Sequence, residues 1–510
     1  MSAVQVNIGQ WVRKNALIYP DKIATKSGER GFSYRTLAER VDRIATGLRA
    51  WGLRKGDRVA LLLMNCPEYV ELVFACSAAG LIAVPLNWRL GQPELEFILR
   101  DCEPKVLFHH ASLAARAEKL GAAVGAIAHR LAVDDAGGPS PYEDFVRSAA
   151  AETAVDPAVG GDDPHLIMYT AGTTGSPKGV VLTHANCFWQ SVNGWALGVS
   201  PNTVALVVLP LFHVGGLNGS VTPMIHVGAT VLLPAKFDVA DTLATMERER
   251  VCGMVAVPAV YQMLYDHPSF EHTDLGSIEA FISGGAPLSL ELIRKYHARG
   301  LEFRQGYGLT ETSPGVTGMG PGECLRKAGT AGRPCLYVDV EVVDAEDRPL
   351  ARGQAGEVRV RGPNVMAGYW NRPEETSRAL RNGWFYSGDI GYLDEDSYLV
   401  LVDRKKDMII SGGENVYPAE VEKVLEQHQA VAEVAVVGRA DARWGEVPVA
   451  FVVLRKGQQA SAEELIEFCS SRIARYKTPK EILLREALPR NAAGKILKPD
   501  LRRELSQRPG

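Results

Sequence analysis

The chain lacks the features of a membrane protein and of a nucleic-acid-binding protein. Its 510 residues include 56 Lys and Arg against 60 Asp and Glu, so no basic excess is available to attract nucleic acid. The most apolar stretches, residues 203–211 and 228–233, are far shorter than the roughly 20 residues of a transmembrane helix and suit buried strands. Residues 1–21 contain no long apolar core, so we expect neither a signal peptide nor an integral membrane segment.

Cysteine is scarce and shows no pattern. The eight cysteines form no Cys-x-x-Cys pair and have no zinc spacing. Buried free thiols are typical of a reducing compartment, so we expect a cytoplasmic protein. The length exceeds what one hydrophobic core normally organises, which predicts several domains or subdomains.

Alternating helix and strand patterns indicate an α/β fold with parallel sheets. Residues 34–51 and 68–79 have helical character, and the apolar segments 58–63 and 82–85 that follow them suit buried strands. The same alternation returns over residues 203–310. We therefore expect two α/β subdomains in this part of the chain.

The remaining segments are patterned differently. Residues 111–163 are rich in Ala, Gly and Asp and predict peripheral helices with a linker. Short alternating strands from about residue 330 indicate a small β-subdomain. Beyond Asp407, a helix at 418–427, two strands and a second helix capped by Ser461 predict a compact α+β domain.

One loop concentrates glycines, hydroxyls and a lysine after an apolar segment. Its sequence is Tyr169-Thr-Ala-Gly-Thr-Thr-Gly-Ser-Pro-Lys-Gly179. Glycine lets backbone N–H groups approach an anion, hydroxyls donate hydrogen bonds and lysine adds positive charge. The groups that predict a nucleotide-phosphate site are Thr170, Gly172, Thr173, Thr174, Gly175, Ser176 and Lys178. A Walker loop is excluded, because Pro177 precedes the lysine and no Ser or Thr follows it.

The loop resembles the signature loop of adenylate-forming enzymes, which include acyl-CoA synthetases, peptide-synthetase adenylation domains and luciferases. Further segments resemble motifs of this superfamily in the same order, over about residues 30 to 500 of the chain; they are residues 210–216, 281–287, 305–312, 386–391, 403–418 and 489–498. Residues 409–420 are most similar to fatty-acid and aryl acyl-CoA ligases. One departure is Ala171, which stands where the superfamily usually has serine and removes one hydroxyl.

The resemblance implies a division into two domains. A large N-terminal AMP-binding domain, residues 1–405, would combine two α/β subdomains with the small β-subdomain. A small, mobile α+β domain, residues 406–510, would follow it. The resemblance places the hinge between them near Lys406.

The resemblance also assigns the nucleotide contacts. Tyr307 would stack on adenine, and Asp389 and Arg404 would hold the ribose hydroxyls. Thr310 would touch the α-phosphate, and Glu311 would bind Mg²⁺ together with Thr174. Further ATP or AMP contacts would come from the phosphate loop and from Gly284, Gly285, Ala286, Gly306 and Gly308.

Other residues are assigned to the acid, to catalysis and to CoA. His213 would stand beside the acyl carboxylate, and Lys495 would swing into the active site during adenylation. The acyl pocket would be lined by His213, Val214, Gly215, Asn218, Tyr261 and Gly308. The loop with Gly412, Gly413 and Glu414 would meet the acyl-adenylate and CoA.

The implied reaction is that of an acid–thiol ligase. A carboxylic acid and MgATP would give acyl-AMP and pyrophosphate, and the CoA thiol would then accept the acyl group. One alternative is an enzyme that stops at adenylation and passes acyl-AMP to a carrier protein or partner enzyme. Another is a non-catalytic sensor, which the presence of Lys178, Glu311, Asp389 and Lys495 together disfavours.

The expected walls of the acid pocket are apolar and rich in glycine. They contain no arginine or lysine that would pair with a second carboxylate. We therefore expect a monocarboxylic acid with an apolar or aromatic body. A homodimer is left open.

Overall fold

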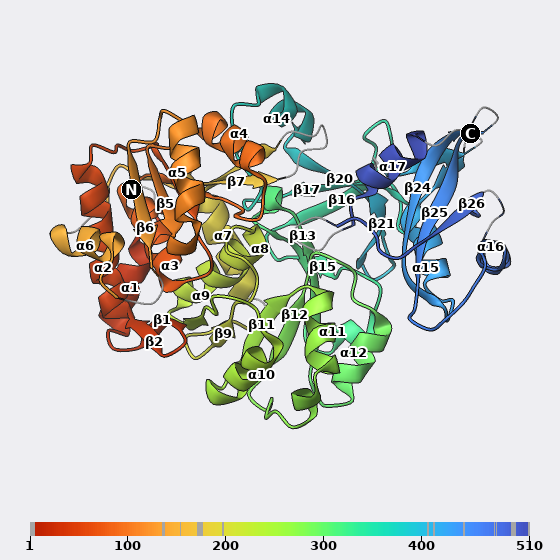
Figure 1. Ribbon diagram of the computed structural model, residues 1–510, viewed down its shortest axis with the longest axis horizontal. Coiled ribbons are helices and arrows are strands. Elements are labelled where there is room, and N and C mark those ends of the chain that lie inside the picture. The colour runs from red at the N-terminus through yellow and green to blue at the C-terminus, as the bar shows by residue number, and fades with distance from the viewer. Residues whose placement is uncertain are drawn as a thin grey trace. The chain divides into compact units, whose positions relative to one another are not determined.

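The computed structural model describes most of the chain (Figure 1). The described residues are 6–134, 138–152, 155–170, 177–195, 198–404, 407–411, 414–441, 444–473, 475, 477–490 and 496–507. The chain divides into two compact units, one with residues 1–340 and 360–385 and the other with residues 341–359 and 386–510. The expected pivot at Lys406 lies outside the described residues, so the boundary at 405/406 stays a prediction.

A seven-stranded sheet forms the first part of the first unit, in the order β18-β8-β7-β4-β3-β5-β6. Its strands are β3 (Arg58–Leu62), β4 (Ile82–Pro85), β5 (Val106–His110), β6 (His129–Val133), β7 (Pro164–Thr170), β8 (Lys178–Thr183) and β18 (Gly368–Tyr369). Strands β3 to β7 pair in parallel, whereas β8 runs antiparallel to both β7 and β18. The two strands expected at 58–63 and 82–85 are confirmed.

Five helices accompany this sheet: α2 (Tyr34–Ala50), α3 (Pro67–Ala79), α4 (Gln92–Cys102), α5 (Ala114–Ala123) and α6 (Pro141–Ser148). Helix α3 is buried along its whole length, begins with Pro67 and ends at Gly80 in the left-handed conformation. The expectation of helices and a linker over 111–163 is wrong in one respect, because β6 is a strand. It pairs only with β5 at the sheet edge and is too short to show a clear alternation.

A nine-stranded sheet forms the second part, in the order β15-β14-β13-β12-β11-β9-β10-β1-β2. Its strands are β1 (Ile23–Ser27), β2 (Arg30–Ser33), β9 (Val204–Leu206), β10 (Thr230–Leu232), β11 (Gly253–Ala256), β12 (Ala280–Ser283), β13 (Phe303–Gly308), β14 (Gly315–Gly318) and β15 (Arg333–Pro334). The run from β1 through β10, β9, β11 and β12 to β13 is parallel. The carboxyl ends of these strands therefore share one edge of the sheet.

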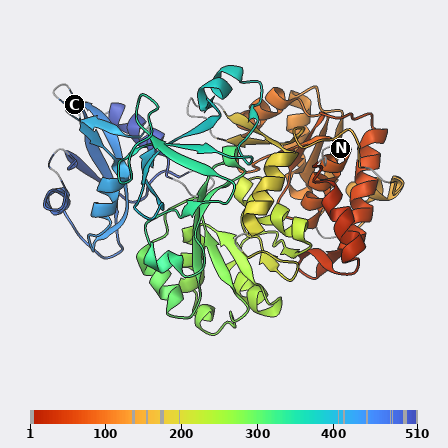
Figure 2. The ribbon, with the colours of Figure 1, turned by 180° about the vertical axis from the view of Figure 1, so that it is seen from behind.

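Helices cover the two faces of this sheet (Figures 1 and 2). On one face, α10 (Val239–Arg248), α11 (Pro258–Asp266) and α12 (Leu290–His297) pack in an apolar core with Phe281 and Phe303. The opposite face looks toward a continuous helical segment made of η2 (Leu217–Val221) and α9 (Thr222–Val227). Helix α7 (His184–Trp195) packs against α9.

Two further sheets complete the fold. One has the order β16-β17-β20-β19 with β21 on β20, and contains β16 (Asp339–Val343), β17 (Gly356–Arg361), β19 (Leu380–Arg381), β20 (Trp384–Leu393) and β21 (Leu399–Arg404). The other has the order β23-β22-β25-β24 with β26 on β25, and contains β22 (Ile409–Ser411), β23 (Glu414–Val416), β24 (Val431–Asp441), β25 (Gly445–Leu454) and β26 (Glu481–Arg485). Three helices accompany the last sheet: α15 (Pro418–Leu425), α16 (Ala462–Ser470) and α17 (Lys498–Ser506). The α+β character expected after Asp407 is confirmed, and the Ser461 hydroxyl accepts the Glu464 N–H that opens α16.

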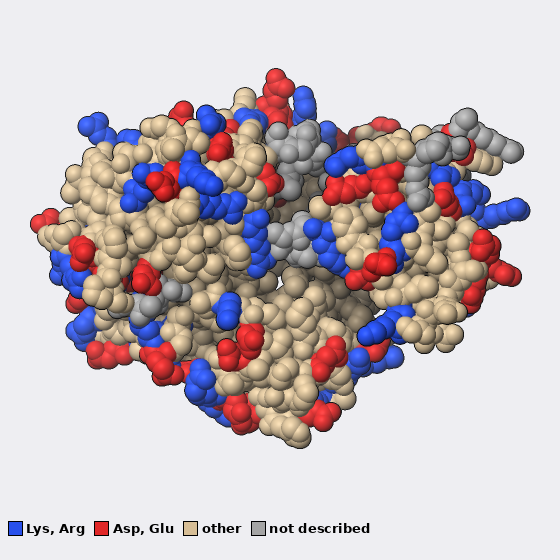
Figure 3. Space-filling model, viewed as in Figure 1, with Lys and Arg blue, Asp and Glu red and all other residues tan. Residues whose placement is uncertain are grey.

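The surface and the thiols agree with the composition. On the face drawn in Figure 3, acidic and basic side chains are intermingled. All eight cysteines are free. Within the described ranges, every helix is too short or too polar to cross a membrane.

Two histidines are buried side by side between β7 and the start of α7. The rings of His165 and His184 lie 5.3 Å apart, and both side chains are fully buried. His165 Nδ1 lies 2.9 Å from the Ser77 hydroxyl, and the Ile8 N–H donates to His184 Nδ1. Burial lowers the pKa of His165 well below its ordinary value and the pKa of His184 to about 4. Both rings are therefore neutral near pH 7.

We predict that this pair makes the fold sensitive to acid. The folded-state pKa of His184 is about 4 and its ordinary value is 6.5, so the unfolded chain binds more protons between these values. The free energy of unfolding should therefore decrease as the pH falls from 6.5 toward 4, by up to about 3 kcal/mol for His184. Urea titrations across this range should show a shallower pH slope for His184→Gln than for the wild type. His272→Gln, at an exposed position, should keep the wild-type slope, and an unchanged slope in His184→Gln would contradict the prediction.

Candidate active site

The predicted phosphate loop joins the antiparallel strands β7 and β8. Thr170 and Lys178 are register partners at the ends of the two strands, and both side chains are half-buried. The predicted contacts Gly172, Thr173, Thr174 and Gly175 lie outside the described residues. The structure therefore places one hydroxyl and one cation opposite each other at the ends of the two strands that the loop joins.

Gly179 explains why β8 can lie so close to its neighbours. A Cβ atom at this position would come within 2.7 Å of Ile167 Cγ2 and 3.2 Å of Trp370 Cβ. Only glycine fits this space without displacing a neighbour. The close packing holds β18 against β8 directly beside Lys178.

Tyr369 connects two of the predicted site residues. Its hydroxyl donates a 2.9 Å hydrogen bond to Glu311 Oε1, and Lys178 Nζ lies 5.3 Å from the centre of its ring. The second distance is in the range of a cation–π interaction. Burial and the Glu311 carboxylate raise the pKa of Tyr369 well above its ordinary value, so its hydroxyl stays a proton donor.

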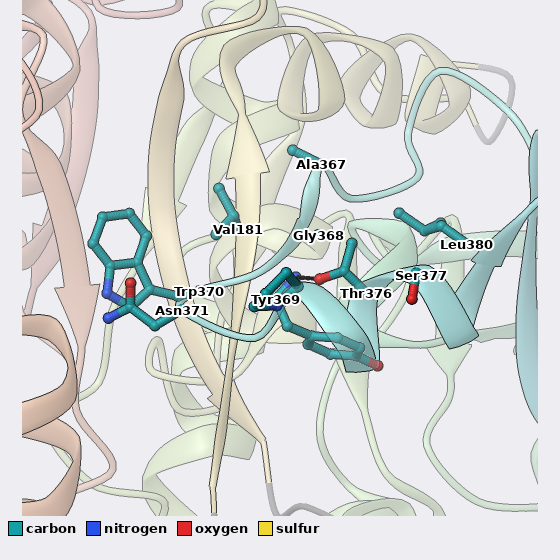
Figure 4. Close-up of a pocket in the computed structure, with 10 residues that line it drawn as sticks. Val181, Ala367, Gly368, Tyr369, Trp370, Asn371, Thr376, Ser377 and Leu380 are labelled. Carbon is teal, nitrogen blue, oxygen red and sulfur yellow. Dashed lines mark hydrogen bonds between the residues drawn. The ribbon is translucent and has the colours of Figure 1, made fainter.

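Strand β18 gives Tyr369 this orientation. Figure 4 shows Tyr369 and Trp370 projecting to different sides of the strand, and the Tyr369 N–H donating to the Thr376 hydroxyl at 2.9 Å. The Trp370 indole N–H donates to the Asp101 carbonyl, and the Asp101 carboxylate accepts the Tyr169 hydroxyl. Asp101 thus links β18 to β7, the strand that leads into the phosphate loop.

A tight turn presents Glu311 to Tyr369. Glu311 lies in the short 3-10 helix η4 (Thr310–Thr312), and its carbonyl accepts the Met366 N–H. The buried Asn364 amide donates to the carbonyls of Thr312 and Gly315, which closes the turn. A Cβ atom at Gly308 would lie 1.5 Å from the Pro314 carbonyl oxygen, so the turn requires glycine there.

The predicted adenine side lies at the carboxyl ends of two parallel strands. Gly284, Gly285 and Ala286 follow β12, and Gly306, Tyr307 and Gly308 end β13. Gly285 has a φ of +79°, which favours glycine, and the ring of Tyr307 is half-buried. Parallel α/β sheets commonly bind ligands at this edge.

His213 is held in a neutral state. It lies directly before the short helix α8 (Val214–Gly216), its ring centre is 4.5 Å from that of Phe212, and burial followed by the charge of Arg89 lowers its pKa to about 4. Asn65 fixes the preceding segment by accepting the Leu211 N–H. At neutral pH His213 can therefore orient a carboxylate by hydrogen bonding but adds no positive charge.

Two residues expected in the acyl pocket belong to the core. Tyr261 is fully buried, its hydroxyl lies 2.8 Å from the carbonyl oxygens of Met254 and Ile282, and its ring packs against aromatic neighbours. Asn218 is also fully buried, with its amide nitrogen 3.2 Å from Cys187 Sγ. These contacts hold both side chains in place, and their role in the acyl pocket stays a prediction. Val214 is buried and Gly215 is half-buried beside His213.

The predicted ribose partners lie on neighbouring strands of the second unit. Asp389 on β20 and Arg404 on β21 are direct register partners of an antiparallel pair. Asp389 is buried, and its N–H donates to the Ser387 hydroxyl. Glu414 begins β23, whereas Gly412, Gly413, Lys406 and Lys495 lie outside the described residues.

The donor set around Glu311 suits a hard cation held mainly by a substrate. Across the described part of the chain, no three His, Cys, Asp or Glu side chains come together as a metal cluster. Mg²⁺ usually takes one or two protein carboxylates and completes its shell with phosphate oxygens and water. Glu311, oriented by Tyr369, fits such a site.

Comparison with known proteins identifies the family. The AMP-binding enzyme family matches residues 12–370, and the AMP-binding enzyme C-terminal domain matches residues 420–495. The chain belongs to the adenylate-forming superfamily. A feruloyl-CoA synthase from Amycolatopsis sp is 43% identical over 98% of this chain and 99% of its own. An indoleacetate–CoA ligase from Aromatoleum aromaticum is 41% identical over 99% of both chains. The structure of ATP-bound MatB from Rhodopseudomonas palustris has a TM-score of 0.92 and 32% identity over 99% of both chains.

This adenylate-forming enzyme is an AMP-forming acid–CoA ligase of the acyl-CoA synthetase type. It uses ATP, Mg²⁺ and CoA. A carboxylate oxygen of the acid attacks the α-phosphorus of ATP, and the bond to pyrophosphate breaks. The CoA thiol then attacks the acyl carbonyl, and AMP leaves. The expected superfamily, fold and reaction are confirmed.

The first step requires the site to bring two anions together. Positive charge and fixed hydrogen-bond donors lower the barrier when they are oriented before the reaction. Lys178 lies at the end of the predicted phosphate loop, and Tyr369 contacts both Lys178 and Glu311. Tyr369 had no signal in the sequence, because 58 residues separate it from Glu311 and tyrosine marks no phosphate motif.

We predict that removing the Tyr369 hydroxyl weakens the use of Mg²⁺. Tyr369→Phe loses the hydrogen bond to Glu311 but keeps the ring beside Lys178. The Mg²⁺ concentration for half-maximal pyrophosphate release should rise roughly tenfold, as expected for loss of a bond to a charged group. Tyr369→Leu should add a loss in ATP affinity, because the ring contact with Lys178 is also removed.

Tyr337→Phe is the matched control, because that side chain is 46% exposed. It should leave the Mg²⁺ titration unchanged. A wild-type Mg²⁺ dependence in Tyr369→Phe would show that the tyrosine does not position Glu311.

Proposed function

We propose that the acid is a monocarboxylic acid with an apolar or aromatic body. The apolar, glycine-rich surroundings of His213 carry this proposal, because burial keeps the histidine neutral and Arg89, the cation that further lowers its pKa, is exposed. Two relatives, a feruloyl-CoA synthase and an indoleacetate–CoA ligase, support an aromatic body. A long-chain fatty-acid–CoA ligase from Mycobacterium tuberculosis, 40% identical, supports an aliphatic one.

We infer the roles of the remaining site residues from the resemblance of their motifs to those of the superfamily. Thr170 and Lys178 bind the triphosphate together with Gly172, Thr173, Thr174 and Gly175, and Thr310 contacts the α-phosphate. Tyr307 stacks on adenine beside Gly284, Gly285, Ala286, Gly306 and Gly308. Glu311 and Thr174 hold Mg²⁺, while Asp389 and Arg404 hold the ribose. The register pairing of the last two supports their shared role.

The C-terminal part of the chain provides the second set of proposed roles. Lys495 stabilises the charge that develops during adenylation, and Lys406 is the pivot between residues 1–405 and 406–510. Gly412, Gly413 and Glu414 form the loop that meets CoA and the acyl-adenylate. Domain rotation of this kind exchanges one catalytic group for another between the two steps.

The enzyme's setting is also part of the proposal. Free thiols at all eight cysteines support a reducing, cytoplasmic location.

A homodimer is compatible with the exposed apolar side chains of Leu17 and Ile18 on α1 (Gln10–Ile18). Size measurement in solution would test it.

A panel of acids tests the proposed substrate class. Pyrophosphate release should be measured with MgATP for aliphatic, aromatic and dicarboxylic acids, with and without CoA, and products identified by mass spectrometry. We expect acyl-CoA from apolar or aromatic monocarboxylic acids and little product from dicarboxylic acids. Preferred turnover of a dicarboxylic acid would refute the proposed class.

Lys495→Ala tests the proposed division of labour. Loss of an oriented electrostatic partner should lower acyl-AMP formation by about 10²-fold or more. CoA transfer from supplied acyl-adenylate should be largely retained, because Lys495 would act only in the first step. Lys480→Ala, at an exposed position of the same domain, should affect neither step. Equal loss of both steps in Lys495→Ala would contradict the assignment.

A further inference from the structure

A pocket of the first unit lies between the nine-stranded sheet and the helical segment η2–α9. The sheet contributes Ala205, Val255 and Ile282, and α9 contributes Met224. Arg304 on β13 also lines the pocket. The pocket is thus mainly apolar, with one guanidinium among its walls.

The pocket lies on the sheet face that also carries the glycines of the predicted acid and adenylate site. Residues two apart in a strand lie on the same face, so Arg304 shares a face of β13 with Gly306, and Gly284 directly follows β12. Ile282 and Arg304 are register partners on β12 and β13. The opposite face holds the core residues Phe281 and Phe303.

The two glycines leave this face open. A Cβ atom at Gly284 would lie in ordinary contact with the Gly306 carbonyl, 3.5 Å away, so neither strand fills the space with a side chain. From Gly306 to Arg304 the strand advances roughly 7 Å. A group attached beyond the reacting carboxylate can therefore lie across the glycines and extend over Ile282 toward Arg304.

The charge of Arg304 is largely balanced by carboxylates. Its side chain is 13% exposed, and its Nε lies 3.5 Å from Glu302 Oε1. That oxygen also accepts the Gly322 N–H, which holds Glu302 in place. Glu279 is a further carboxylate that lines the pocket. The Arg304 guanidinium is therefore paired with one carboxylate, Glu302, and a second carboxylate, Glu279, lies on the same pocket wall.

We propose that Arg304 is a specificity residue that recognises a neutral oxygen at the distal end of the acyl group. The guanidinium donates a hydrogen bond to a hydroxyl or ether oxygen carried by an otherwise apolar or aromatic body. A distal carboxylate is disfavoured by Glu302 and Glu279. The inference rests on the proposed monocarboxylic substrate and refines it, because no cation was expected among the pocket walls.

Two matched sets of acids test this proposal. One set is cinnamic, 4-methoxycinnamic and 4-carboxycinnamic acid, and the other is octanoic, 8-hydroxyoctanoic and octanedioic acid. In the set whose body the enzyme accepts, kcat/KM for pyrophosphate release should be about tenfold higher for the oxygenated acid than for the parent. The dicarboxylic acid should be the poorest substrate.

Variants of the ion pair separate recognition from a purely structural role. In Arg304→Met the ratio of kcat/KM between the oxygenated acid and its parent should fall toward one, and Arg304→Lys should keep part of it. Glu302→Gln should raise the relative use of the dicarboxylic acid, because it removes a repelling charge. Arg294→Met, at an exposed position on α12, should keep the wild-type ratios.

Each result decides between the proposals. A ratio near one in the wild type, or an unchanged ratio in both Arg304→Met and Glu302→Gln, would overturn the role of Arg304 while leaving the monocarboxylic class intact. Should Arg304→Met fail to fold, Arg304→Lys and Glu302→Gln provide the same comparison. Preferred use of a dicarboxylic acid by the wild type would overturn both the substrate class and this inference.

Discussion

The phosphate side of the active site depends on the backbone pairing of strand β8 with its two neighbours. Pairing with β7 sets Lys178 opposite Thr170 across the loop, and pairing with β18 brings Tyr369 beside the same lysine. Gly179 permits both, because any side chain there would collide with Ile167. The Tyr369 hydroxyl in turn donates a hydrogen bond to the Glu311 carboxylate. Backbone hydrogen bonds between the strands thus fix the points from which these side chains extend.

Burial decides which of the site's groups carry charge. His213 is neutral at pH 7 because desolvation lowers its pKa to about 4, so it adds no positive charge. Tyr369 stays protonated because burial and the Glu311 carboxylate raise its pKa, and it can therefore orient that carboxylate. The buried histidines 165 and 184 follow the same rule away from the site, where their neutrality links stability to pH. One physical effect therefore governs both the site and the fold.

Much of the fold and the reaction type could be predicted from the chain alone. The helices and strands between residues 34 and 85 have strong periodicity, and the structure places them within a residue or two of expectation. The loop at 169–179 indicated a phosphate site because its residue types already have the required chemistry. Strand β6 was missed, since five residues at a sheet edge leave too weak a pattern. The burial of Tyr261 and Asn218 had no signal in the motifs, because a motif's neighbourhood does not show how deeply a side chain is packed.

The sequence by itself determined the α/β architecture through local periodicity, and the superfamily and the chemistry of acid activation through the resemblance of its motifs to those of adenylate-forming enzymes. Only the tertiary structure decided how distant segments combine. It joined Tyr369 to Glu311 and Lys178, and it placed Arg304 on the same sheet face as the glycines of the site. The physical reason is that sheet register and burial arise from contacts between strands far apart in the chain, and local periodicity does not contain them.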